Sequence, residues 1–234
     1  MKVLLFIVVL LTLSCNVKYL QVGAGNGSQV RAITTSEKQL LDSLEYDYTK
    51  LSELLEQTPS PITRLTRTYG QYNYATDEVE YNEKTYEGIM FYCTNTTAHT
   101  ITEKFRDDLR SQGYLIYQSQ RNHTFKPDEV SMIKSEDQFD IVRLEDVQAP
   151  NYDLDNFAIL AKLKEWNTKH PFQITGASHD WISANFTDKL PKDLSAFALE
   201  MYEFCPDIVI QGTDTVEALE AETKKTNQLY LWWD

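Results

Sequence analysis

Acidic side chains that could take part in catalysis gather near the end of the sequence. They are Glu200, Glu203, Asp207, Asp214 and Asp234. Two carboxylates at a fixed separation can act as acid and base in hydrolysis, and carboxylates with an amide such as Gln211 can hold a hard cation. A solvated acidic surface explains the same residues more simply. Glu200, Asp207 and Asp234 are therefore the candidate residues of an alternative, in which the protein is an extracytoplasmic hydrolase or a metal-binding enzyme.

Cys205 is the other residue whose type could do chemistry, as a nucleophile. Its position at the C-terminal end of a predicted helix, beside Glu203 and Asp207, raises the pKa of a thiol and disfavours the reactive thiolate. We therefore expect a packed, unreactive cysteine. A disulfide between Cys205 and Cys93 is a second alternative, because an oxidising compartment would permit one.

The four histidines, at positions 99, 123, 170 and 179, do not have the spacing of a metal site. The sequence contains no His-x-His, no His-Glu-x-x-His and no Cys-x-x-Cys. We expect no metal and no cofactor. Ser178-His179-Asp180 contains the residue types of a catalytic triad, but neighbours in a chain point in different directions. The sequence leaves open whether the protein is an enzyme, and it favours a non-catalytic protein.

The elements that position these residues follow from the apolar pattern and its breakers. A capping box at Thr34 and Glu37 opens an amphipathic helix that ends before the prolines at 59 and 61, so residues 35–58 are predicted to form an N-terminal helix. Tyr- and Thr-rich segments between 64 and 93 predict strands. Residues 88–118 then read as a strand-helix-strand unit, in which the helix opens near Thr100 and Gly113 closes it. The next predicted strand is 139–142.

The C-terminal third predicts a helix at 153–169 and a hairpin over 172–186. A helix from Asp193 to Cys205, a short strand at 208–210, a helix capped at Asp214 and a terminal strand at 229–233 follow. This order indicates an α+β fold with mixed sheets and helices packed on one face. Residues 88–118 and 180–211 share the strand-helix-strand order, which is a hint of two similar units.

The net charge of the chain excludes one class of binding partner. The 234 residues include 22 Lys and Arg against 35 Asp and Glu, a net charge of -13. Such a chain repels phosphate backbones, so we expect no nucleic acid partner.

The first residues predict that the protein is located in the cell envelope. Lys2 precedes an unbroken apolar run at 3–11, which is too short to span a membrane and is typical of a signal peptide at 1–14. Ser14-Cys15 at its end is similar to a bacterial lipobox, which implies a lipid anchor such as palmitate on Cys15. Residues 15–34 then form a flexible tether. Secretion after cleavage at Ala24 is the alternative.

The C-terminal residues carry a recognisable set of motifs. Over about 155–234 the chain resembles the uncharacterised bacterial family catalogued as domain of unknown function 4253. The residues that carry the resemblance, here called the motif residues, are Glu200, Tyr202, Cys205, Pro206, Asp207, Gln211, Gly212, Trp232, Trp233 and Asp234. The resemblance implies a fold unit and no reaction, so we divide the body into an N-terminal α/β subdomain at 59–150 and a C-terminal α+β domain at 151–234.

Trp232 and Trp233 bear on the function that we expect. Adjacent strand residues face opposite sides, so one can lie in the core while the other is exposed, although both can also be buried. An exposed aromatic side chain suits partner recognition. We expect an envelope-anchored lipoprotein whose non-catalytic domain binds a protein or peptide partner.

Overall fold

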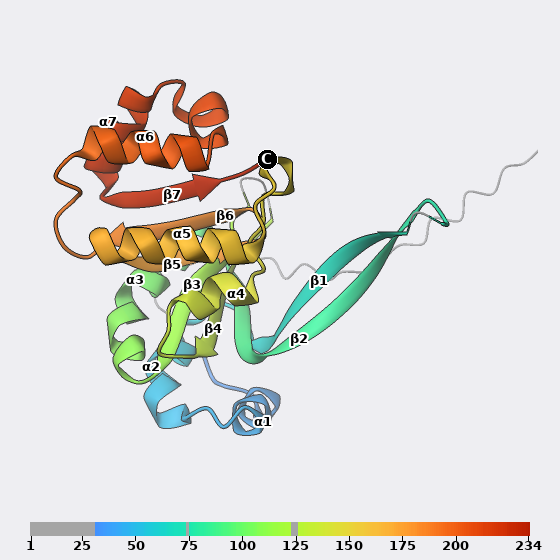
Figure 1. Ribbon diagram of the computed structural model, residues 1–234. Helices are drawn as coiled ribbons and strands as arrows, with labels where there is room; N and C mark the ends of the chain where they lie inside the picture. The colour runs from blue at the N-terminus through green and yellow to red at the C-terminus, as the bar shows by residue number, and fades with distance from the viewer. Residues whose placement is uncertain (1–30, 74, 123–125) are drawn as a thin grey trace, which may run out of the picture.

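A computed structural model describes residues 31–73, 75–122 and 126–234. The predicted signal peptide, Cys15 and most of the tether lie outside these residues. The described chain forms one seven-stranded sheet of order β1-β2-β4-β3-β5-β6-β7 (Figure 1). The strands are β1 (Thr63–Asn73), β2 (Glu78–Cys93), β3 (Tyr114–Gln120), β4 (Asp128–Lys134), β5 (Phe172–Ser178), β6 (Trp181–Phe186) and β7 (Gln228–Trp232). β3 and β5 pair in parallel, and the other five neighbouring pairs are antiparallel, so the sheet is mixed.

Helices cover both faces of this sheet. They are α1 (Thr35–Ser43), α2 (Tyr48–Gln57), α3 (Asn95–Ser111), α4 (Phe139–Leu144), α5 (Asn156–Lys169), α6 (Leu194–Phe204) and α7 (Val216–Thr226), with a 3-10 turn η1 (Pro150–Tyr152) and a π-helix η2 (Ile208–Thr213). Along β3, Tyr114 and Ile116 pack in the core cluster of α1 to α3, whereas Leu115 and Tyr117 pack in the cluster of α4 to α7. The α+β class is confirmed, and the expectation of helices on one face is wrong, because alternate residues of the central strands are buried on opposite sides.

The predicted N-terminal helix is two helices. The capping box is confirmed, because the Thr34 side chain accepts from the Glu37 N–H and the Glu37 carboxylate accepts from the Thr34 N–H. The helix breaks at Glu45, whose φ of 53° is left-handed, and Asp47 caps the second helix. Leu44 and Tyr46, on either side of Glu45, are both buried in the core cluster of α1 to α3.

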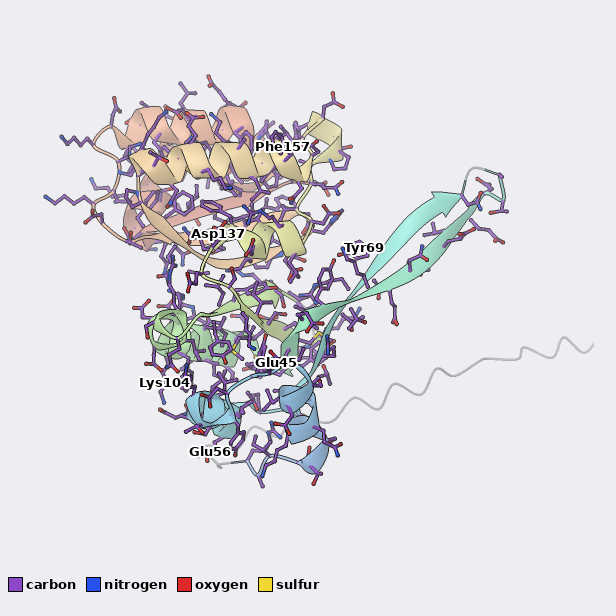
Figure 2. All side chains as sticks on the ribbon, turned by 60° about the horizontal axis from the view of Figure 1, so that its bottom comes forward. Glu45, Glu56, Tyr69, Lys104, Asp137 and Phe157 are labelled. Atoms are coloured by element: carbon purple, nitrogen blue, oxygen red, sulfur yellow. The ribbon has the colours of Figure 1, made fainter. Side chains whose placement is uncertain are left out.

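The N-terminal hairpin is longer than the sheet it belongs to. β1 and β2 pair along their length, from the pair of Thr63 with Met90 to the pair of Asn73 with Glu78. β4 pairs with β2 only from Gly88 onward. The pairs beyond Thr66 and Thr85 form a two-stranded ribbon, here called the arm, which leaves the body of the protein (Figure 1). Tyr81 on the arm is 75% exposed. Figure 2 shows the arm from another side, with Tyr69 near its base.

Three predictions of elements are corrected by the structure. The predicted strand at 139–142 is helix α4, and residues 128–134, for which the sequence pattern predicts no element, are strand β4. The predicted strand at 208–210 belongs to the π-helix η2. The second strand-helix-strand unit, 180–211, is therefore not formed, because no strand follows α6 until β7.

The remaining C-terminal elements are confirmed within a few residues. α5, the β5–β6 hairpin, α6 and β7 lie where the pattern predicts them, and Thr215 caps α7 in place of Asp214. The β3–β5 pair carries the sheet across the predicted subdomain boundary at 150. No helix among the described residues is both long and apolar enough to cross a bilayer.

Candidate functional site

Asp207 and Asp234 meet at the C-terminal edge of the sheet in a hydrogen-bonded clasp. The Asp207 carboxylate accepts from the Tyr152 hydroxyl at 2.7 Å and from the backbone N–H of Asp234 at 3.0 Å. The Gln211 amide donates to Asp207 at 3.2 Å and to Asp234 at 3.4 Å. Burial alone would raise the pKa of Asp207, but these hydrogen bonds outweigh it and hold the pKa below its ordinary value.

Glu200 lies apart from this clasp. It sits on α6, is exposed, and accepts a hydrogen bond of 3.0 Å from the indole N–H of the buried Trp166. The structure therefore brings together two of the three carboxylates of the hydrolase alternative and ties both to groups that hold the fold. Among the described residues, no group of three His, Cys, Asp or Glu side chains could hold a metal ion.

Cys205 is fully buried, and burial raises the pKa of its thiol to about 12. Its Sγ donates to the Trp232 carbonyl at 3.0 Å. Cys93 is also a free, buried cysteine, in the core cluster on the opposite face of the sheet. The alternative of a Cys93–Cys205 disulfide is therefore not realised, because the sheet separates the two side chains.

The remaining motif residues divide between the core and a groove. Trp233 is buried in the core and Tyr202 is half-buried beside it, while the Pro206 carbonyl accepts from the first N–H groups of η2. Trp232 faces the other side of β7 and is half-buried. Of the two alternatives for this pair, one exposed or both buried, the structure gives an intermediate case, since Trp232 also packs against the core cluster that contains Trp233. Trp232 lies at the wall of a groove that it shares with Gln211 and Gly212.

This groove, here called the β7 groove, has a volume of about 440 Å³. Three elements form its walls, and α6 and α7 lie side by side next to β7 (Figure 1). β7 contributes alternate residues of one face, α7 contributes residues at helical spacing, and η2 contributes a turn. The lining residues are Arg121, Ile208, Gln211, Gly212, Thr213, Leu219, Glu222, Thr223, Thr226, Gln228, Tyr230 and Trp232.

Arg121, just beyond the end of β3, is the cation in this lining. The guanidinium carbon lies 4.5 Å from the ring centre of Trp181 and 5.6 Å from that of Tyr230. Its Nε donates to the Gln118 side chain at 2.9 Å. Burial lowers the pKa of Arg121 from its ordinary value. Stacking on aromatic faces holds the planar group in one orientation, as binding sites for anions require.

Comparison with known proteins bears on the part of the chain that builds the groove. Residues 129–234 match the family described as Domain of unknown function (DUF4253). The C-terminal part of the chain is a DUF4253 domain. The match begins within β4, earlier than residue 155, where the resemblance in the sequence begins. No curated protein and no solved structure matches the chain.

A second cluster of ionisable groups lies where the DUF4253 domain meets β1. Arg67 pairs with Glu145 through two contacts of 2.7 Å and with Glu129 at 2.9 Å. The Tyr117 hydroxyl donates to Glu145 at 2.6 Å, and burial raises the pKa of Glu145 in spite of these partners. These four residues are called the Arg67 network. Its groups satisfy one another in the interior, which is the arrangement of a structural ion pair.

Another hollow, of about 740 Å³, lies between the end of α5 and the start of α6 and contains Glu200. Its charged lining consists of Lys169, Lys189, Lys192, Asp188, Asp193 and Glu200, with His170 beside them. Charges of both signs on long side chains give this hollow no fixed recognition pattern. The β7 groove is the better candidate, because it combines motif residues with a half-buried, stacked arginine.

Arg121 is the functional candidate that sequence reasoning missed. The strand-helix-strand unit predicted at 88–118 stops short of it, whereas β3 continues through the polar residues Gln118, Ser119 and Gln120. The length of β3 places Arg121 just beyond a strand end. It does not place Arg121 against β7, because the partner strands are distant in sequence.

Proposed function

We propose that the protein is a non-catalytic binding protein that holds a small ligand in the β7 groove, which its DUF4253 domain forms together with Arg121. The observation that carries this proposal is the composition of the groove, in which the motif residues Gln211, Gly212 and Trp232 face the stacked guanidinium of Arg121. A volume of about 440 Å³ suits a small ligand and is too small for a folded partner.

The condition of the carboxylates supports binding over catalysis. A general acid or base needs a proton-transfer partner on the substrate side and a pKa near the working pH. Asp207 instead has its oxygens engaged by Tyr152, Gln211 and a backbone N–H, and its pKa is lowered. We assign Asp207 to holding η2 against β7.

Gly212 offers a test that spares the fold. A Cβ built at this glycine would meet nothing closer than the Asp207 carbonyl oxygen at 3.8 Å, so a large side chain can enter the groove without a clash at its root. We would screen small organic ligands by ¹⁵N NMR and compare the wild type with Gly212→Trp. Ile210→Trp is the matched control, because Ile210 is on the same π-helix, is 63% exposed and lies outside the groove lining.

The expected result is a set of ligands that shift the resonances of Tyr230 and Trp232 in the wild type and in Ile210→Trp. The same ligands should leave Gly212→Trp unshifted. Ligands that bind all three proteins equally, or that shift the residues of the α5–α6 hollow, would contradict the proposal.

We further propose that a lipid on Cys15 anchors the mature protein to a bacterial membrane in the cell envelope. The support is the sequence of residues 1–15, with Lys2 before the apolar run and Cys15 after it. In a bacterial host, the wild type should incorporate a palmitate analogue and fractionate with membranes. Cys15→Ser should lose the label, and a labelled, membrane-bound Cys15→Ser protein would contradict the anchor.

A further inference from the structure

Arg121 differs from most of the described arginines in forming no salt bridge. The structure describes seven arginines, and those at 31, 64, 67, 106 and 143 each pair with a glutamate or an aspartate. Within the described part of the chain, no salt bridge is formed by Arg110 or by Arg121. Arg121 is the one of these two that lines a cavity.

Asp128 acts on Arg121 through its charge but forms no salt bridge with it within the described residues, because its oxygens bind other groups. Asp128 accepts from the Gln118 and Asn95 side chains at 2.7 and 2.8 Å and from the Asn122 N–H at 2.8 Å. Arg121 itself donates to Gln118 and contacts the Tyr230 hydroxyl, which leaves donors of its guanidinium unused. Burial has removed part of the water around Arg121, and no carboxylate is in salt-bridge contact with it, so a bound anion would gain a charge-assisted pair there.

The walls of the groove indicate which anion fits. Ile208, Leu219 and the rings of Tyr230 and Trp232 offer apolar contact for the body of a ligand. Glu222 is the acid in the lining, and Asp234 lies close by through Gln211. One guanidinium against nearby carboxylates matches a single negative charge better than the nearly double charge of a phosphate monoester. A planar carboxylate also matches the fork of the guanidinium.

We propose that the β7 groove binds a small monocarboxylic acid with an aromatic or aliphatic body, whose carboxylate pairs with Arg121. This rests on the proposed function and adds the class of ligand. The apolar body of the ligand lies against Trp232 and Tyr230, and its carboxylate forms the salt bridge that Arg121 lacks in the described structure.

The test is an NMR titration of the full mature chain with three probes of the same shape class: 3-phenylpropanoate, its neutral amide and phenyl phosphate. The indole N–H signal of Trp232 is the reporter. The acid should bind at least about tenfold more tightly than the amide, because the charge-assisted pair is lost with the amide. Phenyl phosphate should bind more weakly than the acid.

Variants separate the arginine from the groove. Arg121→Gln should remove the preference for the acid over the amide, whereas Arg121→Lys should keep part of it. Arg110→Gln is the control and should behave as the wild type. The comparison of acid with amide in the wild type keeps the test valid even if Arg121→Gln folds poorly.

Each remaining outcome decides the matter. If acid and amide bind the wild type equally and Gly212→Trp blocks both, the carboxylate inference is wrong while the proposed function stands. Tighter binding of phenyl phosphate also overturns the monocarboxylate. If no probe binds at millimolar concentration and the ligand screen finds nothing in the groove, the proposed function fails and takes the inference with it.

Discussion

At the scale of single residues, burial sets the chemistry of the two cysteines. It raises the pKa of Cys93 and of Cys205 to about 12, so neither forms a thiolate near neutral pH. In a Cys15→Ser variant, we expect neither thiol to react with Ellman's reagent at pH 8 until the protein is unfolded in denaturant. A thiol that reacts within seconds in the native protein would reopen the assignment of Cys205 as a nucleophile.

Asp207 is a second residue whose environment makes a prediction. The two carboxylate oxygens of Asp207 accept hydrogen bonds from the Tyr152 hydroxyl and from the backbone N–H of Asp234. Asp207→Asn replaces one of these oxygens by an amide N–H₂, which cannot accept. Loss of charge-assisted hydrogen bonds of this kind costs about 2–3 kcal/mol of unfolding free energy at pH 7. Tyr152→Phe removes one donor and should cost about 1 kcal/mol.

The pH dependence of the Asp207 effect has a defined sign. The folded pKa of Asp207 is lowered, so its stabilisation is present above the ordinary pKa of about 3.9 and is lost as the pH falls through the folded value. Denaturation of wild type and Asp207→Asn between pH 7 and pH 3 should show their difference shrinking toward the acid end. A difference that does not change with pH would mean that the charge of Asp207 contributes nothing.

At the scale of elements, the backbone at Glu45 explains where the sequence pattern failed. The apolar spacing continues from Leu41 to Leu51, so periodicity alone predicts one helix. The interruption depends on burying Tyr46, whose hydroxyl donates to backbone carbonyls of Glu87 and Met132. Such a contact joins distant parts of the chain, and local propensity contains no information about it.

The left-handed φ of Glu45 makes a prediction about α1 and α2. Glycine adopts this region without strain, so Glu45→Gly should raise the unfolding free energy by about 0.5–1 kcal/mol. Asp107→Gly is the control, because Asp107 is exposed within α3 and glycine in a helix costs about 1 kcal/mol. Thermal denaturation measures both variants. A melting temperature of Glu45→Gly below that of the wild type would contradict the assignment of strain.

β4 and η2 were missed for related reasons. β4 alternates polar and apolar residues over only four positions, from Glu129 to Met132, which is a weak strand pattern. Its polar residues, Glu129 and Ser131, are buried because Arg67 of a distant strand pairs with them. In η2 the run Ile208-Val209-Ile210 is strand-like by composition. The clasp from Asp207 to Gln211, four residues apart, requires a helical turn there instead.

The candidate site was predictable in part. The motif residues pointed to the right end of the molecule, and the opposite orientations of Trp232 and Trp233 follow from the alternation of a strand. The pairing of Arg121 with β7 depends on the β3–β5 contact, which brings together segments from the two halves of the sequence. Sequence patterns within either half do not predict it.

At the scale of the whole molecule, the Arg67 network joins the N-terminal hairpin to the DUF4253 domain. Arg67→Met leaves Glu129 and Glu145 without their cation in the interior, which should cost about 3–5 kcal/mol. Replacing both glutamates by glutamine in the same chain should recover much of that loss.

Arg143→Met is the matched control for this prediction. Arg143 pairs with Asp137 and Asp140 at the surface, where ion pairs contribute about 0–1 kcal/mol. Denaturant titration of the wild type and the three variants measures all of these values. An Arg67→Met protein as stable as Arg143→Met would show that the network does not hold the two parts together.

The arm has a consequence for how the molecule opens. Beyond Arg67, which the Arg67 network holds at the base, the backbone hydrogen bonds of the arm join only β1 and β2. The β2 residues from Glu78 to Thr85 are exposed, so separating the two strands beyond Arg67 uncovers almost no core. Regions of this kind open with a small free energy while the rest stays folded. Amide hydrogens of residues 68–73 and 78–83 should therefore exchange with deuterium far sooner than those of β3 and β4. A protease that reaches the tip at Asp77 should cut the chain and leave the two pieces associated through the sheet.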